Sequence, residues 1–312
     1  MPEIEFVVNI TKLRKEFKHC VAVDDVDLQI ESGEIFGLIG ANGSGKTTFL
    51  KILATVLKPT SGSAQILGYD ISRKPEKIRG FIGYLPESLS IYNDLKIYEY
   101  MDFFAGAYRI PKKERQNTIS DVLELMGLTS IRNLFVKDLS RGMKQRLGIA
   151  RTIIHDPILL LLDEPAYGLD PKIRIEIREI IKELGYMGKT IIISSNMLSD
   201  LAVICNRIGI MRNGKLIFCG YVNDILSQID TAFTLEIGIQ SDVVTAKEIL
   251  RKQQNIGDID VNINVLKAKY TGRREDIHSV LSSLVNSGVQ VTYFQETFVD
   301  LEDVYLKLES GE

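Results

Sequence analysis

The chain has 312 residues, of which 45% are hydrophobic and 25% are charged, and its formal net charge is −3. This length predicts one large domain or two unequal ones, and no apolar run approaches the roughly 20 residues that a membrane-spanning helix needs. The first residues carry acids where a secretory signal needs bases, and the three cysteines are too sparse for a disulfide framework. The near-neutral charge provides no broad basic field for nucleic acid. We therefore expect a globular, cytosolic protein.

The N-terminal elements are typical of an α/β layout. Residues 5–12 and 21–30 alternate polar and apolar side chains, which predicts strands of a half-exposed sheet. A short apolar run at residues 34–39 leads into a glycine-rich loop. Helical spacing follows over residues 46–57, and Pro59 ends it.

Helices dominate the middle of the chain, and buried strands return after it. We expect helices at residues 96–110, 112–126, 141–154 and about 172–184, and apolar strands at 81–85, 158–162 and 190–194. Alternation of this kind predicts a largely parallel sheet. Asn213-Gly214 lies between strand segments 208–211 and 215–219 and predicts a hairpin, because these residues tolerate the positive φ of a tight turn.

The pattern changes after about residue 227. We expect strands at residues 233–239, 258–263, 266–270 and 289–294, and helices at 243–252, 275–286 and 301–308. Their β-α-β-β-α-β order is typical of a ferredoxin-like split βαβ sandwich. The sequence thus predicts two domains, an α/β domain over 1–227 with a helical subdomain at about 87–157, and a small α+β domain over 228–312.

The glycine-rich loop matches G-x-x-x-x-G-K-[ST], a motif that cradles phosphate groups when a strand precedes it and a helix follows. Its glycines let backbone N–H groups converge on phosphate oxygens, and the helix adds the positive end of its dipole. Lys46 would contact the β- and γ-phosphates of the nucleotide, and the Thr47 hydroxyl would bind Mg²⁺. The predicted nucleotide-binding residues of this loop are Gly40, Ala41, Asn42, Gly43, Ser44, Gly45, Lys46, Thr47 and Thr48.

An acid pair, Asp163-Glu164, follows the apolar strand predicted at 158–162. In a phosphate-loop NTPase, Asp163 would hold Mg²⁺, usually through water, and Glu164 would orient and deprotonate the attacking water. Acid pairs after strands are also common as helix N-caps. The pair therefore gains its meaning from occurring together with the phosphate loop.

A third segment, Leu139-Ser140-Arg141-Gly142-Met143, opens a helix upstream of Asp163. It resembles the Leu-Ser-Gly-Gly-Gln signature of the ATP-binding cassette (ABC) family, with Arg141 and Met143 in place of a glycine and the glutamine. The resemblance extends over about residues 4–225. Its other landmarks are Phe17 at the position that stacks on adenine, 83–87 around the Gln-loop, 168–170 after the acid pair, and 194–196 at the switch-histidine loop.

The resemblance implies a head-to-tail pair of cassettes, in which Ser140 and Gly142 of one copy cap ATP on the phosphate loop of the other. It also implies that Glu87, where glutamine is usual, contacts Mg²⁺ or its water. Asn196 stands in place of the switch histidine; its amide can donate a hydrogen bond to the γ-phosphate but can neither become cationic nor relay a proton. We therefore expect ATP to bind normally and hydrolysis, with Glu164, Asn196 and Glu87 in the catalytic roles, to be slower than in a histidine-bearing relative.

Six aromatic residues gather beside the Gln-loop segment, where the resemblance implies a groove for a helix of a membrane subunit. They are Tyr92, Tyr98, Tyr100, Phe103, Phe104 and Tyr108. Packing within the helical subdomain is the alternative, although neighbouring Phe103 and Phe104 cannot both face inward on one helix. The segment 298–306 resembles the C-terminal ending of cassettes that serve ABC-2 type exporters.

The sequence thus predicts the ATP-hydrolysing subunit of an ABC-2 type transporter, with ATP and Mg²⁺ as its cofactors. Its expected partners are a second cassette and separate membrane subunits, which would hold it at the inner face of the cell membrane; no nucleic acid is expected. One alternative is a soluble ABC ATPase without a role in transport. Another, which Asn196 keeps open, is a nucleotide-gated module with weak hydrolysis.

Overall fold

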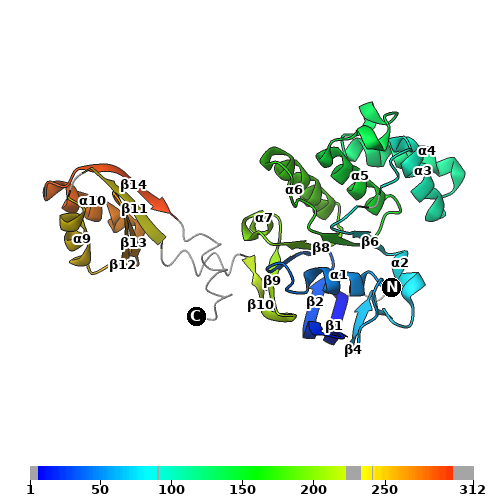
Figure 1. Ribbon diagram of the computed structural model, residues 1–312, viewed down its shortest axis with the longest axis horizontal. Coiled ribbons are helices and arrows are strands. Elements are labelled where there is room, and N and C mark those ends of the chain that lie inside the picture. Colours follow the sequence, from blue (N-terminus) through cyan, green and yellow to red (C-terminus); the bar gives the residue numbers. More distant parts are fainter. Residues whose placement is uncertain (1–5, 90, 223–232, 241, 298–312) are drawn as a thin grey trace. The chain divides into compact units, whose positions relative to one another are not determined.

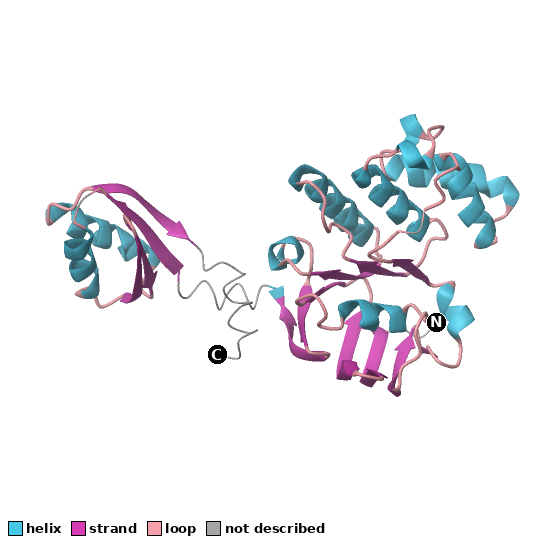
Figure 2. Cartoon of the chain, viewed as in Figure 1, coloured by secondary structure: helices cyan, strands magenta, loops and turns pink. Residues whose placement is uncertain are grey.

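A computed structural model describes residues 6–89, 91–222, 233–240 and 242–297 (Figures 1 and 2). The chain divides into two compact units, Met1–Tyr221 and Val222–Glu312. The predicted boundary between residues 227 and 228 lies outside the described residues. Among the described residues, no helix combines the length and apolar character needed to cross a membrane.

The central sheet of the first unit has the strand order β10-β9-β3-β8-β7-β6. Its strands are β3 (Ile35–Ile39), β6 (Ile82–Leu85), β7 (Leu159–Asp163), β8 (Thr190–Ser195), β9 (Arg207–Arg212) and β10 (Lys215–Tyr221). All pairs are parallel except the hairpin of β9 and β10, whose turn residues Asn213 and Gly214 have φ values of 48° and 82°. Every residue of β3, β7 and β8 is buried, as expected for central strands covered on both faces.

A second, antiparallel sheet was not foreseen as a separate layer. Its strand order is β2-β1-β4-β5, and its strands are β1 (Phe6–Phe17), β2 (Cys20–Glu31), β4 (Ser61–Ile66) and β5 (Tyr69–Asp70). The expectation of a largely parallel sheet therefore describes only the central one. The sequence did not predict β4 because it begins Ser-Gly-Ser, a poor strand former, and pairing with β1 determines its conformation instead.

Helix α1 (Lys46–Leu53) lies between the two sheets (Figure 1). Its apolar residues Phe49, Leu50 and Ile52 are buried in a core that contains side chains from both sheets. Burying one helix on two sides fixes its first turn firmly. The phosphate loop is therefore held by a core that both sheets share.

The remaining helices of the first unit are α2 (Pro75–Arg79), α3 (Ile97–Ala107), α4 (Lys112–Leu125), α5 (Arg141–Ile153), α6 (Pro171–Tyr186) and α7 (Leu198–Ala202). Short 3₁₀ turns occupy Thr129–Ile131 and Val136–Asp138. Helices α5 and α6 cover the face of the central sheet opposite α1 (Figure 2). Helices α3 and α4 pack on each other and on α5, within the segment predicted as a helical subdomain.

The second unit has the predicted β-α-β-β-α-β order. Its elements are β11 (Phe233–Ile239), α9 (Val243–Arg251), β12 (Ile256–Asn262), β13 (Val265–Tyr270), a 3₁₀ turn (Arg274–Asp276), α10 (Ile277–Asn286) and β14 (Val291–Thr297). The strand order β12-β13-β11-β14, antiparallel throughout, places β13 between β11 and β12, which is the split βαβ arrangement. The helix predicted at 301–308 lies outside the described residues.

Candidate active site

The phosphate loop connects β3 to α1 and is confined by its neighbours. Gly43 and Gly45 have φ values of 84° and 113°, which side-chain-bearing residues rarely adopt. A Cβ atom on Gly45 would lie 2.1 Å from the carbonyl oxygen of Ala22, and one on Gly40 would lie 2.3 Å from that of Met211. Conformation therefore requires glycine at position 43, space requires it at position 40, and both require it at position 45.

Lys46 folds back over this loop. Its Nζ donates hydrogen bonds to the carbonyl oxygens of Gly40 (2.6 Å) and Ala41 (3.2 Å) and lies 3.4 Å from Glu164 Oε1. The side chain is 5% exposed, so its charge acts in a poorly solvated environment. It lines a cavity of about 310 Å³ with Thr47, Thr48, Glu87, Glu164 and other residues of the loop.

The buried carboxylate of Asp163 lies behind this cavity, at the end of β7. Its Oδ1 accepts hydrogen bonds from Thr47 Oγ1 (3.1 Å) and Ser194 Oγ (2.8 Å). Its Oδ2 is buried and has no hydrogen-bond partner among the described residues. A buried, unsatisfied carboxylate oxygen beside a hydroxyl is a suitable ligand set for a hard cation such as Mg²⁺.

Ser194 and Tyr84 are site residues to which sequence reasoning gave no role. The Ser194 hydroxyl bridges the acid pair, since it donates to Asp163 and accepts from the Glu164 backbone N–H at 2.9 Å. Parallel pairing places Asp163 opposite Ser194. Aligning the ends of the two predicted strands could therefore have indicated Ser194 as a neighbour of the acid pair. The Tyr84 hydroxyl is buried without a described partner, and burial, with the charges of Asp163 and Glu87, raises its pKa.

Glu164 directly follows β7 with a φ of 49°, and its side chain is 8% exposed. Burial raises the pKa of this carboxyl, whereas the charge of Lys46 and a hydrogen bond from the Asn196 backbone act in the opposite direction. The group is thus a stronger base than an exposed glutamate. Glu164 borders both the 310 Å³ cavity and a second cavity of about 220 Å³.

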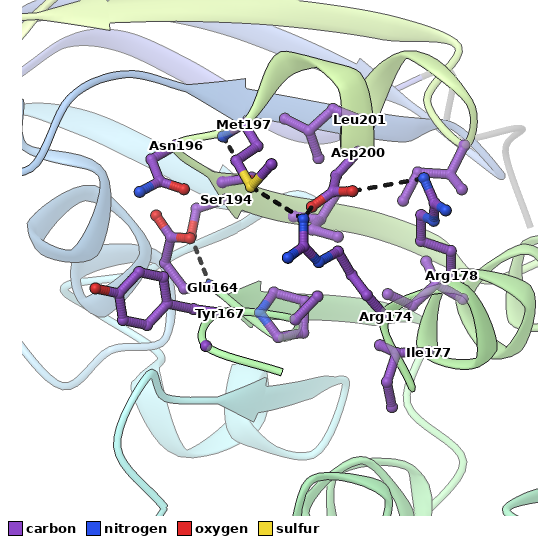
Figure 3. Close-up of a pocket in the computed structure, with 17 residues that line it drawn as sticks. Glu164, Tyr167, Arg174, Ile177, Arg178, Ser194, Asn196, Met197, Asp200 and Leu201 are labelled. Atoms are coloured by element: carbon purple, nitrogen blue, oxygen red, sulfur yellow. Dashed lines mark hydrogen bonds and ion pairs between the residues drawn. The ribbon is translucent and has the colours of Figure 1, made fainter. Parts of the chain in front are cut away.

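Asn196 lies on the rim of that second cavity, close to Glu164 and Tyr167 (Figure 3). It follows β8, and Met197 separates it from α7. Asp200 on α7 lies 3.7 Å from Arg174 Nη1 and 3.5 Å from Arg178 Nη1, both on α6. These ion pairs fix α7, and with it the loop that carries Asn196.

Three predicted nucleotide-binding residues outside the loop, Phe17, Ser140 and Gly142, are not among those that line the phosphate-loop cavity. Phe17 is 42% exposed at the end of β1, with Lys15 Nζ 5.1 Å from its ring centroid. Ser140 and Gly142 line a separate cavity of about 190 Å³ at the start of α5. The chain thus carries two separate groups of predicted nucleotide-binding residues.

Comparison with known proteins shows the family of this chain. A family model described as "ABC transporter" matches residues 23–167. The uncharacterized ABC transporter ATP-binding protein YxlF of Bacillus subtilis is 32% identical over 312 residues, covering 97% of this chain and 99% of its own. The chain belongs to the ABC transporter family.

Two further comparisons concern ATP-binding proteins of this family. The probable multidrug ABC transporter ATP-binding protein YbhF of Escherichia coli is 37% identical over 224 residues; the match covers 72% of this chain, which spans only 39% of YbhF. A solved dimeric structure of the ATP-binding cassette MJ0796, in a post-hydrolysis state bound to ADP and Pi, has a TM-score of 0.63 and 27% identity. The structural match covers 69% of this chain and 98% of the MJ0796 chain. Both proteins are described as ATP-binding members of this family or as an ATP-binding cassette.

Proposed function

We propose that this chain hydrolyses ATP, with Mg²⁺, to drive the membrane subunits of an ABC-2 type exporter from the cytoplasmic face of the cell membrane. The observation that carries the proposal is the cluster in which Lys46 Nζ lies 3.4 Å from Glu164 Oε1 and Thr47 Oγ1 lies 3.1 Å from Asp163 Oδ1. This cluster combines a cation for phosphate, oxygen ligands for a metal and a base. The description of YbhF as a probable multidrug transporter protein supports export as the direction.

The residues around the cavity fit ATP and a metal ion. Lys46 now bonds to neutral carbonyl oxygens of the loop, and charged phosphate oxygens would be stronger acceptors for it. Thr47 and Asp163 would hold Mg²⁺, and Glu87, which lines the same cavity, would add an oxygen. When bound, Mg²⁺ neutralises charge on the phosphates that are being separated.

Glu164 would accept a proton from the attacking water. Its raised pKa makes it a better proton acceptor, and Lys46 helps to keep it ionised before the proton arrives. Ser194 fixes the backbone of Glu164 through the 2.9 Å hydrogen bond from the Glu164 N–H. Asn196 lines the 220 Å³ cavity that Glu164 also borders. Its side-chain amide would donate a hydrogen bond to the γ-phosphate.

A second cassette would complete each nucleotide site. The Ser140 hydroxyl caps α5 by accepting the Met143 N–H at 3.3 Å, which leaves its own O–H available to donate to a phosphate oxygen. The helix start adds further N–H groups and a positive dipole end. This chemistry supports the head-to-tail dimer that the family resemblance implies, with Ser140 and Gly142 acting on the nucleotide of the partner copy.

The aromatic cluster near α3 supports a membrane partner. Tyr100 is fully buried in the chain's own core, whereas Tyr92 and Phe103 are 53% and 52% exposed. Tyr92 packs against Phe103, Phe104 and Tyr100, so the exposed rings rest on a buried base. Packing within the chain thus accounts for Tyr100, and the exposed rings support the proposal that an apolar helix of the membrane subunit docks here.

ATP turnover by the purified chain, alone and with its co-purified membrane subunit, tests the proposal. We expect Mg²⁺-dependent turnover that rises with the membrane subunit, and a loss of about 10²–10⁴-fold in Glu164→Gln. Glu183→Gln, at an exposed position, is the control. Turnover indifferent to any membrane protein would favour the soluble ATPase, and tight ATP binding without turnover would favour the nucleotide-gated module.

The docking surface has its own test. Phe103→Ala removes an exposed ring of the aromatic cluster, and Tyr186→Ala removes a ring that is 90% exposed on α6. We expect only Phe103→Ala to reduce co-purification of the membrane subunit. Equal retention by the two variants would contradict docking at this cluster.

A further inference from the structure

Arg141, the residue that departs from the ABC signature, contacts the loop that follows Glu164. It is the first residue of α5, and its Nη2 donates a hydrogen bond to the carbonyl oxygen of Tyr167 at 3.0 Å. A Cβ atom built on Gly168 would lie 2.5 Å from that Nη2, so the guanidinium lies directly against the Gly168 backbone. Gly168 also has a φ of 66°. The loop conformation and the arginine thus fit each other.

Other contacts hold the starts of α5 and α6 together but do not reach this loop. A Cβ atom on Gly142 would lie 2.7 Å from Ile173 Cγ2, so the two helices approach closely there. Further along, Arg146 forms an ion pair with Glu176. Of these contacts, that of Arg141 lies closest in sequence to Glu164.

A short path links Arg141 to the base. The Tyr167 N–H donates to the Glu164 carbonyl oxygen at 3.1 Å, closing a turn that begins at Glu164. Arg141 holds the carbonyl group at the other end of this turn. Glu164 and Tyr167 both line the 220 Å³ cavity (Figure 3). Movement of the start of α5 would therefore displace the turn on which Glu164 lies.

The electrostatics indicate that Arg141 needs this acceptor. A cation in the first turn of a helix faces the positive end of the helix dipole, which is unfavourable. The Tyr167 carbonyl supplies partial negative charge to the guanidinium at that point. A glycine at position 141 could form no such link.

We propose that Arg141 is a positioning residue that couples the start of α5 to the Glu164 turn. Because Ser140 and Gly142 flank Arg141, engagement of α5 with the nucleotide of a partner copy would be transmitted to the base of this chain's own site. The proposal rests on the proposed ATP-hydrolysing dimer. It deepens that function by naming an internal link between the two nucleotide sites.

ATP turnover and its cooperativity test this link in the full-length chain. We expect Arg141→Ala to lower kcat by roughly 2- to 30-fold, the range that a lost coupling usually produces, and to lower the Hill coefficient for ATP, with KM little changed. Arg141→Lys should keep part of the wild-type kcat and Hill coefficient, since an ammonium can reach the same carbonyl but cannot lie flat on the Gly168 peptide. Arg132→Ala, at an exposed arginine, is the matched control and should behave as wild type.

A double-mutant cycle separates coupling from general damage. Gly168→Ala places a methyl group against the guanidinium, and Arg141→Ala removes that obstacle, so the losses in kcat should be non-additive. If the wild-type chain hydrolyses ATP and Arg141→Ala has the same kcat and Hill coefficient, the role of Arg141 is overturned and the proposed function is not. Absence of turnover in the wild-type chain would overturn this proposal and the proposed function together. A fall in the kcat of Arg141→Ala that is fully explained by a lower melting temperature would also overturn the positioning role of Arg141.

Discussion

Glu164 lies where the folded protein disfavours the charge that its proposed role needs. Its carboxyl is almost fully buried, and Lys46 at 3.4 Å offsets only part of the cost, so the pKa remains raised. A carboxyl with a raised pKa binds its proton more tightly in the folded than in the unfolded chain. Stability is therefore lost as the pH rises from the ordinary glutamate pKa, about 4.3, through the raised folded value.

This environment predicts that Glu164→Gln stabilises the protein at neutral pH. The amide removes the buried charge, so its melting temperature should exceed that of the wild type at pH 7. The difference should disappear below about pH 4, where Glu164 is protonated in both states. Thermal unfolding of both proteins across this range measures the effect. A variant that is less stable than the wild type at pH 7 would contradict the direction of the pKa shift.

Asn196 supports a second prediction at the residue scale. Histidine at this position could carry a positive charge and exchange a proton, which the asparagine amide cannot. We expect Asn196→His to raise kcat several-fold in the presence of the membrane partner, because the Asp200 ion pairs would still fix the loop. Asn196→Ala, which removes the donor, should lower kcat. An Asn196→His variant that hydrolyses no faster than the wild type would contradict the expectation.

At the scale of elements, the site exists because parallel strands end at one edge. The phosphate loop follows β3, the acid pair lies at the end of β7, and Asn196 follows β8. Pairing of Asp163 with Ser194 sets the register of β7 and β8. The local parts of this arrangement were predictable, since the loop, the acids and the hairpin each have short sequence patterns. The contact of Arg141 with Tyr167 joins residues distant in sequence and depends on packing of α5 against α6, so no local pattern carries it.

The phosphate loop gives a prediction with an internal control. Gly43→Ala would meet no atom within 4 Å and incurs only the strain of its φ of 84°, about 1–2 kcal/mol. Gly45→Ala would meet the Ala22 carbonyl oxygen at 2.1 Å in addition to its φ of 113°. We expect Gly45→Ala to be the more destabilising change and to weaken ATP binding more. Urea unfolding and nucleotide titration measure both, and equal losses would contradict the steric argument.

At the scale of the whole molecule, the chain combines two units with separate cores. Ile66 belongs to the core around α1, whereas Leu266 belongs to a core formed within the second unit. The sequence predicted both folds from periodicity, because each unit buries its own regular elements. It did not predict the antiparallel sheet, because β4 owes its conformation to pairing with β1 rather than to its own residues.

Separate cores predict separate unfolding transitions. Ile66→Ala and Leu266→Ala each remove a fully buried side chain, at a cost of about 2–5 kcal/mol, and each should lower only the transition of its own unit. ATP with Mg²⁺ should raise only the transition that Ile66→Ala lowers, since all the predicted nucleotide-binding residues lie in that unit. At a ligand concentration one hundred times the Kd, the gain is about 2.7 kcal/mol. Calorimetry of the full chain makes the comparison. A single transition that both variants lower would mean that the two units unfold together, and a nucleotide shift of the transition lowered by Leu266→Ala would place ligand contacts in the second unit.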